Sequence, residues 1–193
     1  MAYYIDIRLH TNAEISCNEL MAALFYKVHI WLAKHAEGRI GVSFPEMKKT
    51  PGGLLRVHGD LSDLITFASG EWRNTLSLWI SQTPVQPIPA HAQSCCVTRI
   101  QSKSAHNKRQ RAMRRRGLTL EEATACIPDT ATKPLNQPFL DIRSASTGQR
   151  VRFFIQQQQA ANAVPGRFSA YGMGQAGTTV PWFDAVPDRS TGL

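Results

Sequence analysis

The segment Tyr3–Leu9, YYIDIRL, places an apolar or aromatic side chain at every second position. Its odd-numbered residues would face one side of a β-strand, and Tyr4, Asp6 and Arg8 would face the other. Such alternation is typical of a strand with one face against a core and the other toward solvent. The sequence therefore predicts a half-buried strand at residues 3–9.

The residues that follow show helical and extended patterns in turn. The predicted elements are a helix capped by Asn18 and ending near Ala36, strands at 40–44 and 54–58, a helix beginning at Asp60, and a strand at 76–81. The first of these helices carries an apolar stripe at helical spacing, formed by Leu20, Leu24, Val28 and Trp31. With residues 3–9 the order is βαββαβ, which is the pattern of a ferredoxin-like domain.

The second half of the chain follows a proline-rich stretch and has a looser pattern. Pro84–His91 contains three prolines and is interpreted as a linker. Extended residues at 94–100 lead into a basic helix that Gly117 would end, and Thr119 with Glu122 predicts the capping box of a short helix. Strands are predicted at 139–143, 150–156, 167–171 and 179–183. We therefore expect an α+β protein with a ferredoxin-like domain at 1–93, a smaller α+β domain with an arginine-rich helix at 94–183, and a flexible tail at 184–193.

The whole net charge of the chain falls in residues 99–116, RIQSKSAHNKRQRAMRRR. This segment holds eight of the 22 Lys and Arg residues and no acid, and the other 14 basic residues equal the 14 acidic ones, so the net charge of +8 lies here. A helix from Lys108 would place on one side Lys108, Arg111, Arg114 and Arg115, with Arg109 and Arg116 on the flank. A charge run is often only a solvated helix face. The absence of interspersed acids favours binding to nucleic acid, because a polyanion relieves the repulsion.

Composition narrows the remaining classes of protein. The 193 residues are 42% hydrophobic and 19% charged, which suits a folded protein with a core. No apolar run approaches the roughly 20 residues that a membrane span needs, and the first residues lack the pattern of a signal peptide, so we expect a cytoplasmic protein. The four cysteines and six histidines show no spacing typical of a metal site. We therefore expect free, partly buried thiols, no metal and no cofactor.

Residues 172–177 satisfy the pattern G-x-G-x-x-G. A dinucleotide-binding loop also needs a following helix and an acidic residue about 20 positions later, and the sequence has neither. The motif is interpreted as a flexible glycine loop, with close approach of the backbone to a phosphate as the alternative.

Several short motifs occur in a fixed order along the chain. They are YIDIRL at 4–9, RIGVSFP at 39–45, RIQSKS at 99–104, LEEA at 120–123, IPDT at 127–130, RSASTGQ at 143–149, YG at 171–172 and VPWF at 180–183. In this order the chain resembles the repeat-processing endoribonuclease of subtype I-F CRISPR systems, a Csy-type CRISPR-associated RNA endonuclease. The resemblance covers nearly the whole chain and is loose at 50–91.

This resemblance implies a function. It implies metal-independent cleavage of CRISPR precursor RNA at the 3′ base of the repeat stem-loop, with the substrate's own 2′-OH as nucleophile. The products would be a 2′,3′-cyclic phosphate and a 5′-OH. The enzyme would then stay on the product hairpin, with other subunits of the type I-F effector complex as partners.

The same resemblance implies roles for individual residues. His29 matches the family's catalytic histidine, a residue type whose pKa near neutrality suits proton transfer. Ser144 would hold the nucleophilic 2′-OH, and Tyr171 would orient the histidine. Ser146 and Thr147 would contact the phosphate region. Without the resemblance, the histidine would be interpreted as a surface or core residue and the three hydroxyls as an ordinary polar turn.

Contacts with RNA are expected along the basic segment. Arg99 and Gln101 are two positions apart on extended chain, so both side chains would reach base edges near the base of the stem. The remaining RNA-binding residues are expected to be Lys103, Lys108, Arg111, Arg114, Arg115 and Arg116, with those of the helix contacting phosphates.

Val151 departs from the family pattern, in which an aromatic residue stacks under the closing base pair. Base–aromatic stacking contributes about 1–3 kcal/mol. Either a neighbour such as Phe153 substitutes, or the stem base is held less tightly. This departure keeps open a second hypothesis, an RNA-hairpin-binding subunit without catalysis. A third hypothesis is a DNA-binding protein with the arginine-rich helix in a major groove.

Overall fold

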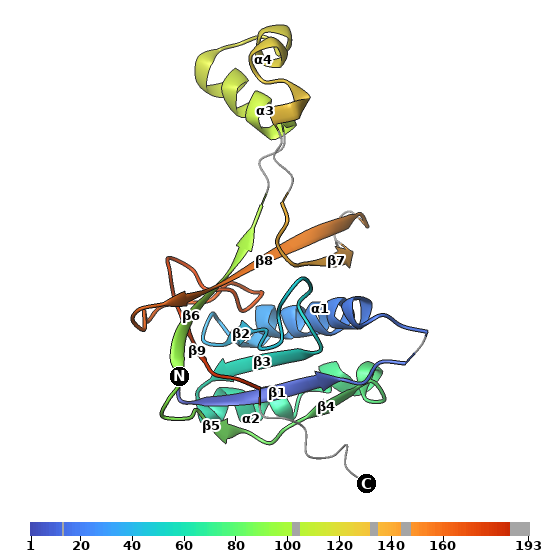
Figure 1. Ribbon diagram of the computed structural model, residues 1–193, viewed down its shortest axis with the longest axis vertical. Coiled ribbons are helices and arrows are strands. Elements are labelled where there is room, and N and C mark those ends of the chain that lie inside the picture. The colour runs from blue at the N-terminus through green and yellow to red at the C-terminus, as the bar shows by residue number, and fades with distance from the viewer. Residues whose placement is uncertain (13, 102–104, 132–134, 144–147, 186–193) are drawn as a thin grey trace. The chain divides into compact units, whose positions relative to one another are not determined.

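The computed structural model describes residues 1–12, 14–101, 105–131, 135–143 and 148–185 (Figure 1). The chain divides into two compact units, of which the larger joins Met1–Arg99 to Pro138–Leu193 and the smaller comprises Ile100–Gln137. The larger unit carries two antiparallel sheets and the main helices, which confirms the predicted α+β class. The domain boundaries expected from the sequence are not tested by this division, and they stay a prediction.

The first sheet is built from the N-terminal half of the chain. Its strands are β1 (Tyr3–Leu9), β2 (Gly41–Ser43), β3 (Leu54–Gly59), β4 (Ile80–Gln82) and β5 (Gln86–Pro87). The strand order is β2-β3-β1-β4, with β5 also paired to β1. Helix α1 (Cys17–His35) follows β1, and helix α2 (Leu61–Ala68) follows β3. The predicted strands at 3–9, 40–44 and 54–58 and both predicted helices are therefore confirmed.

Helix α1 is capped by Ser16, and the prediction of Asn18 as the cap was wrong. The Ser16 hydroxyl accepts a hydrogen bond from the Glu19 N–H at 3.2 Å, and the Glu19 carboxylate accepts one from the Ser16 N–H at 3.2 Å. A capping box needs Glu or Gln three residues after the cap. Glu19 meets this need for Ser16, whereas the residue three positions after Asn18 is Met21.

The predicted apolar stripe of α1 is confirmed at three of its four positions. Leu20, Leu24 and Val28 are buried. Trp31 is only partly buried, and its ring packs edge-on against Phe67 of α2 with the ring centroids 5.0 Å apart. This packing fixes α1, and with it the position from which the side chain of His29 extends.

Strand β1 is buried on both faces, so the prediction of a half-buried strand was wrong. Tyr4 and Asp6, on the face expected to meet solvent, are 3% and 8% exposed. The fully buried Arg56 of β3 donates to both carboxylate oxygens of Asp6, at 2.7 and 2.9 Å, and to the Phe183 carbonyl at 2.7 Å. The Phe183 ring covers this ion pair, 3.7 Å from the guanidinium carbon. The alternation within residues 3–9 could not predict this burial, because the covering residue, Phe183, lies near the other end of the chain.

The prediction of a strand at 76–81 was wrong at its beginning. Glu71–Leu76 form a 3-10 helix, η1, and β4 begins only at Ile80. The N–H of Trp79 donates to the carbonyl of Leu76 at 2.8 Å, which closes a turn where extended chain was expected. Leu76 is therefore buried at the end of η1 rather than in a strand.

Two further expectations differ from the structure. The predicted linker Pro84–His91 contains β5, which pairs with β1 next to β4. Proline lacks an N–H and is tolerated at such a sheet edge. The strand predicted at 167–171 is not formed, and Phe168 makes only an isolated bridge to Gly174. The chain turns back between them, where Gly172 has a φ of +70°.

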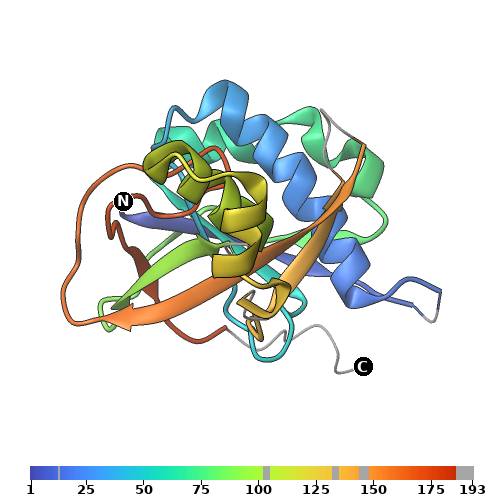
Figure 2. The same ribbon diagram turned by 90° about the horizontal axis from the view of Figure 1, so that it is seen from above.

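The second sheet comprises β6 (Gln93–Ile100), β7 (Phe139–Arg143), β8 (Arg150–Ala160) and β9 (Val180–Trp182), in the order β7-β8-β6-β9. These strands confirm the predictions, except that β8 continues beyond residue 156. Helix α1 lies beside the β7–β8 hairpin (Figures 1 and 2). The Gln157 side chain of β8 pairs with the N–H and the carbonyl of Phe44, at 3.0 and 3.2 Å. This amide ties β8 to the end of β2.

The smaller unit contains α3 (Ala105–Arg116), α4 (Leu120–Cys126) and a 3-10 helix, η2 (Asp129–Ala131). As predicted, α3 ends before Gly117, which has a φ of +66°. The predicted capping box of Thr119 and Glu122 is also confirmed. Arg109 of α3 is partly buried and lies 2.9 Å from a carboxylate oxygen of Asp129. This ion pair joins α3 to the segment after α4.

All four cysteines are free thiols, as predicted. In the part of the chain that the structure describes, no helix is long and apolar enough to span a bilayer. Among the same residues, no group of three or more His, Cys, Asp or Glu side chains could hold a metal ion.

Candidate active site and nucleic-acid interface

His29 has one of its two ring nitrogens engaged by the backbone. Its Nδ1 lies 2.9 Å from the carbonyl oxygen of Ala170. A carbonyl oxygen can only accept a hydrogen bond, so Nδ1 carries the proton of the neutral imidazole. Nε2 then keeps its lone pair, which is the form that a general base needs. The fold therefore selects the tautomer in which Nε2 can take up a proton.

Tyr171 lies flat against the imidazole of His29. The two ring centroids are 3.7 Å apart and the ring planes differ by 7°. Tyr171 also packs on Phe25 of α1 and Phe153 of β8, with centroid distances of 5.9 and 4.8 Å. The structure thus brings together His29 and Tyr171, which the sequence named as a pair. The neighbouring Ala170 carbonyl was missed, because a backbone group leaves no signal in the side-chain pattern.

Two glycines fix the loop that carries Tyr171. The Gly172 carbonyl accepts a hydrogen bond from the Val42 N–H of β2 at 2.9 Å, and a Cβ on Gly172 would lie 2.7 Å from a Val42 methyl carbon. The Gly174 N–H donates to the Val97 carbonyl of β6 at 2.8 Å. The glycine motif is therefore held by both sheets rather than free, and the Gly174 N–H is already engaged by protein.

Arg99, near the end of β6, belongs to the same stack of rings. Its guanidinium carbon lies 4.6 Å from the centroid of Phe153, whose ring packs on Tyr171, which in turn covers His29. Stacking fixes the plane of this exposed guanidinium and uses only its π face, so its N–H groups remain donors for a ligand. A continuous column of side chains thus joins Arg99 to the imidazole.

Phe153 cannot replace the aromatic residue that is missing at Val151. Its side chain is 2% exposed and faces the core, so the expectation that it could stack on a base was wrong. Val151, two residues earlier on β8, is 39% exposed. The hairpin therefore presents an aliphatic side chain at the position where the family pattern has an aromatic one.

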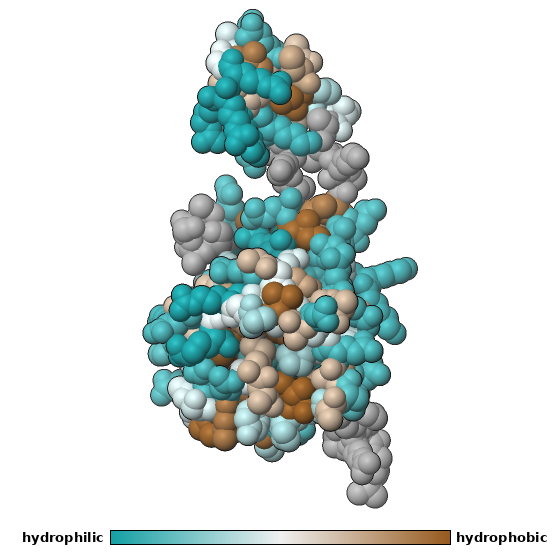
Figure 3. Space-filling model, turned by 90° about the vertical axis from the view of Figure 1, so that its left-hand side faces the viewer, coloured by the Kyte–Doolittle hydropathy of each residue, from teal (hydrophilic) through white to brown (hydrophobic). Residues whose placement is uncertain are grey.

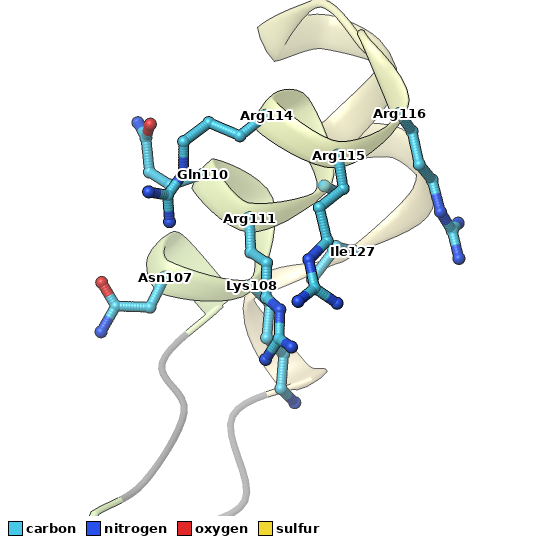
Figure 4. A pocket seen from close by; sticks show the side chains of 9 residues that line it. Asn107, Lys108, Gln110, Arg111, Arg114, Arg115, Arg116 and Ile127 are labelled. Carbon is cyan, nitrogen blue, oxygen red and sulfur yellow. The ribbon is translucent and has the colours of Figure 1, made fainter.

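The arginine-rich helix α3 presents its charge around a groove. The groove has a volume of about 610 Å³ and is lined by side chains of α3 together with Ile127. Figure 4 shows Lys108, Arg111 and Arg115 pointing the same way, while Arg114 lies on the side of Gln110. Hydrophilic residues cover much of the visible face of this unit, with a few apolar residues between them (Figure 3). The arginines other than Arg109 are exposed, and such a surface suits a polyanion.

Several expected site residues cannot be compared with the structure. Lys103, Ser144, Ser146 and Thr147 lie outside the described residues, and their roles stay predictions. Gln101 directly follows β6 and is exposed.

The two units together define a class of protein. The larger unit holds a histidine whose Nε2 can accept a proton, and the smaller unit carries a 12-residue helix rich in arginine. These features define a basic α+β protein equipped for proton transfer and for binding a polyanion. The chain belongs to the Cas_Csy4 family of CRISPR-associated proteins, whose family model matches residues 4–183.

Two relatives match this chain over their whole length. A protein of Escherichia coli (strain UTI89 / UPEC), named CRISPR-associated endonuclease Cas6/Csy4, is 36% identical over 185 residues, which is 95% of this chain and 100% of the relative. A protein of Pseudomonas aeruginosa (strain UCBPP-PA14) with the same name is 38% identical over 190 residues, again 95% of this chain and 100% of the relative. The resemblance drawn from the short motifs is therefore confirmed.

Proposed function

We propose that this protein is a metal-independent endoribonuclease that cleaves CRISPR precursor RNA at the 3′ base of the repeat stem-loop. The observation that carries the proposal is the hydrogen bond from His29 Nδ1 to the Ala170 carbonyl, because it leaves Nε2 as a proton acceptor. The name shared by both relatives, CRISPR-associated endonuclease, supports the class of reaction. The basic helix supports a nucleic acid as the substrate.

The reaction needs only positioning and proton transfer. His29 Nε2 takes the proton of the 2′-OH, the 2′ oxygen attacks the adjacent phosphorus, and the bond from phosphorus to the 5′ oxygen of the next nucleotide breaks. The 5′ oxygen takes up a proton from solvent as it leaves, and the imidazolium of His29 returns its proton to solvent, so the products are a 2′,3′-cyclic phosphate and a 5′-OH. Tyr171 keeps the imidazole plane in place. Ser144 holds the 2′-OH while Ser146 and Thr147 contact the phosphate, roles that the family resemblance supports.

The hairpin is held by the basic segment. Arg99 and Gln101 donate hydrogen bonds to base edges near the base of the stem, and arginine suits guanine because it can donate to two acceptors at once. The phosphates are bound by Lys103, Lys108, Arg111, Arg114, Arg115 and Arg116. These contacts do not involve the bond that is cut. The enzyme therefore keeps its product and serves as a subunit of the type I-F effector complex.

The proposal includes a ferredoxin-like fold for the first sheet. Support comes from the strand order β2-β3-β1-β4 and from the positions of α1 after β1 and α2 after β3. In this arrangement His29 extends from α1, a helix whose apolar side is buried in the core.

Incubation with a repeat hairpin RNA in EDTA tests the proposed function. We expect cleavage to a cyclic phosphate, and a rate about 10²–10⁴-fold lower for His29→Ala, which is the usual contribution of a general base. Hairpin affinity should stay the same. His35→Ala is the matched control, because His35 is exposed on the last turn of the same helix.

Two other outcomes would replace the proposal. Intact RNA bound tightly by the wild type would show a hairpin-binding subunit without catalysis, a hypothesis that the exposed Val151 keeps open because the family pattern has an aromatic residue at this position. Equal competition by duplex DNA of the same sequence would favour a DNA-binding protein.

A further inference from the structure

A pocket of about 620 Å³ lies in the larger unit between α1 and the β7–β8 hairpin. Its lining includes Glu19 and Tyr26 from α1 and Asp141, Arg143 and Arg150 from the hairpin. None of these side chains takes part in the chemistry proposed above. The pocket combines an aromatic ring, which can stack on a flat ligand, with charged groups of both signs, which can accept and donate hydrogen bonds.

This pocket lies close to His29 of the proposed catalytic centre. Tyr26 precedes His29 by three residues, so the two side chains lie on the same side of α1, one turn apart. Arg143 and Gly148 line the pocket and directly flank residues 144–147 in the chain. A group bound in the pocket would therefore lie beside Arg143 and Gly148, about one helical turn of α1 from His29.

The charged side chains of the pocket determine whether it binds a phosphate or a base of the RNA. Two carboxylates, Glu19 and Asp141, balance two guanidinium groups, Arg143 and Arg150. Hydrogen bonds from Ser16 and the nearby charge of Arg150 hold the pKa of Glu19 below its usual value, so this carboxylate is ionised at neutral pH. Because these charges cancel, a further phosphate would gain no net attraction from the pocket. A neutral base would instead find acceptors for an exocyclic amino group and donors for its ring nitrogens and carbonyls.

We infer that this pocket receives the base of the nucleotide immediately 3′ of the scissile phosphate. The inference rests on the proposed function, because it extends the cleavage site by one nucleotide. The stem lies on the 5′ side of the cut. The strand that leaves after cleavage lies on the 3′ side, and it needs a binding site of its own. Stacking on Tyr26 anchors the nucleotide whose 5′ oxygen leaves, which aligns that oxygen for departure. A base with an amino group is preferred over uracil.

Single-turnover cleavage in EDTA of two RNAs tests this inference. Both carry the repeat hairpin with one nucleotide 3′ of the cut, which is cytidine in one RNA and abasic in the other. For the wild type, we expect the abasic RNA to react about tenfold more slowly, within the range for loss of one stacked base. Tyr26→Ala should slow the cytidine RNA by the same factor and leave the rate on the abasic RNA unchanged. Tyr26→Phe keeps the ring and should behave as the wild type.

Controls separate this inference from folding defects. Lys34→Ala, an exposed position on the last turn of α1, should change neither rate. Unchanged affinity of Tyr26→Ala for the cleaved hairpin shows that the variant is folded. Equal wild-type rates on the two RNAs, or a Tyr26→Ala defect that persists on the abasic RNA, overturn the inference.

A second RNA pair distinguishes failure of this inference from failure of the proposed function. If the wild type cuts neither RNA, the proposed function is wrong. In that case the pocket is tested by measuring the affinity of the wild type for the same two RNAs, each carrying a 2′-deoxy nucleotide at the cut. A lower affinity for the abasic RNA supports the pocket, and equal affinities overturn it as well.

Discussion

The two units of this protein use their charged residues in opposite ways. In the larger unit, Arg56 is buried against Asp6, and His29 is hydrogen-bonded on one ring nitrogen and covered by Tyr171. In the smaller unit, the arginines of α3 other than Arg109 are exposed, and the buried positions of α3 and α4 are alanines. Under the proposed function, packing would set the geometry for chemistry, while exposed charge would supply affinity for RNA. Mutations in the two units should therefore change different measured quantities.

The largest effect on hairpin binding is expected from removing charge on α3. The triple variant Arg111→Ala, Arg114→Ala and Arg115→Ala should weaken hairpin binding on the order of 100-fold, since each loses a charge-assisted contact to a phosphate. The slope of log affinity against log salt should fall by about 2–2.7 units. The cleavage rate at saturating protein should stay the same. Binding titrations at several salt concentrations and single-turnover kinetics measure both quantities.

A control with the same change in net charge sharpens this test. Lys34, Lys49 and Arg73 are exposed basic residues of the larger unit. Replacing all three by alanine should leave the salt slope nearly unchanged. If this control weakened binding as much as the α3 variant, overall charge rather than the helix would determine affinity.

A smaller effect, on stability, is expected from His58 of the larger unit. Burial, with a smaller contribution from the charge of Arg56, lowers the pKa of His58 to about 3, and its Nε2 lies 2.8 Å from the Ser43 hydroxyl. The unfolded chain has the ordinary value of about 6.5, so between pH 6.5 and 3 it binds a proton that the folded chain does not. The free energy of unfolding should therefore fall by about 1.4 kcal/mol for each pH unit below 6.5.

Urea unfolding at pH 7, 6 and 5 measures this dependence. His58→Gln removes the titrating group and should flatten the acid side of the curve, whatever its stability at pH 7. His35→Gln, at an exposed position, should keep the wild-type slope. Parallel curves for the wild type and His58→Gln would show that His58 does not govern the acid response.

The smallest effect is expected from the side-chain column between Arg99 and His29. Phe153→Leu removes one ring of this column, and an aromatic pair contributes about 0.5–1.5 kcal/mol. The saturated cleavage rate should therefore fall about 2- to 12-fold. Phe154→Leu is the matched control, because this neighbour packs on Phe139 instead, with ring centroids 5.4 Å apart. Equal losses in the two variants would mean that the column does not position the imidazole.

Local patterns predicted the fold where a segment's own residues determine its structure. The alternation in β1, the apolar spacing of α1 and the stop at Gly117 all lie within a few consecutive residues. The same reasoning failed where a distant segment intervenes. Phe183 covers Asp6 and Arg56, which buries a strand face that its own sequence assigns to solvent.

The candidate site shows the same limit. His29 and Tyr171 were named because they match residues of the family that the chain resembles, and the structure brings their rings together. The carbonyl of Ala170, 141 positions from His29, could not be predicted because any residue type supplies one. Phe153 was one of two alternatives for the missing aromatic contact at Val151, but the pleat of β8 turns it into the core between Arg99 and Tyr171. The sequence therefore indicated the candidate side chains of the site, but it did not predict the contacts that hold these side chains in place.

The central claim is that the larger unit holds the neutral imidazole of His29 with its proton on Nδ1, leaving Nε2 to accept the proton of the 2′-OH. Nitrogen-15 NMR of the histidine-labelled protein above pH 8 tests this claim directly, with the His29 signals assigned by their loss in His29→Gln. The account predicts a protonated Nδ1 and an unprotonated Nε2 before RNA is added. A proton on Nε2, or rapid averaging between the two nitrogens, would contradict it.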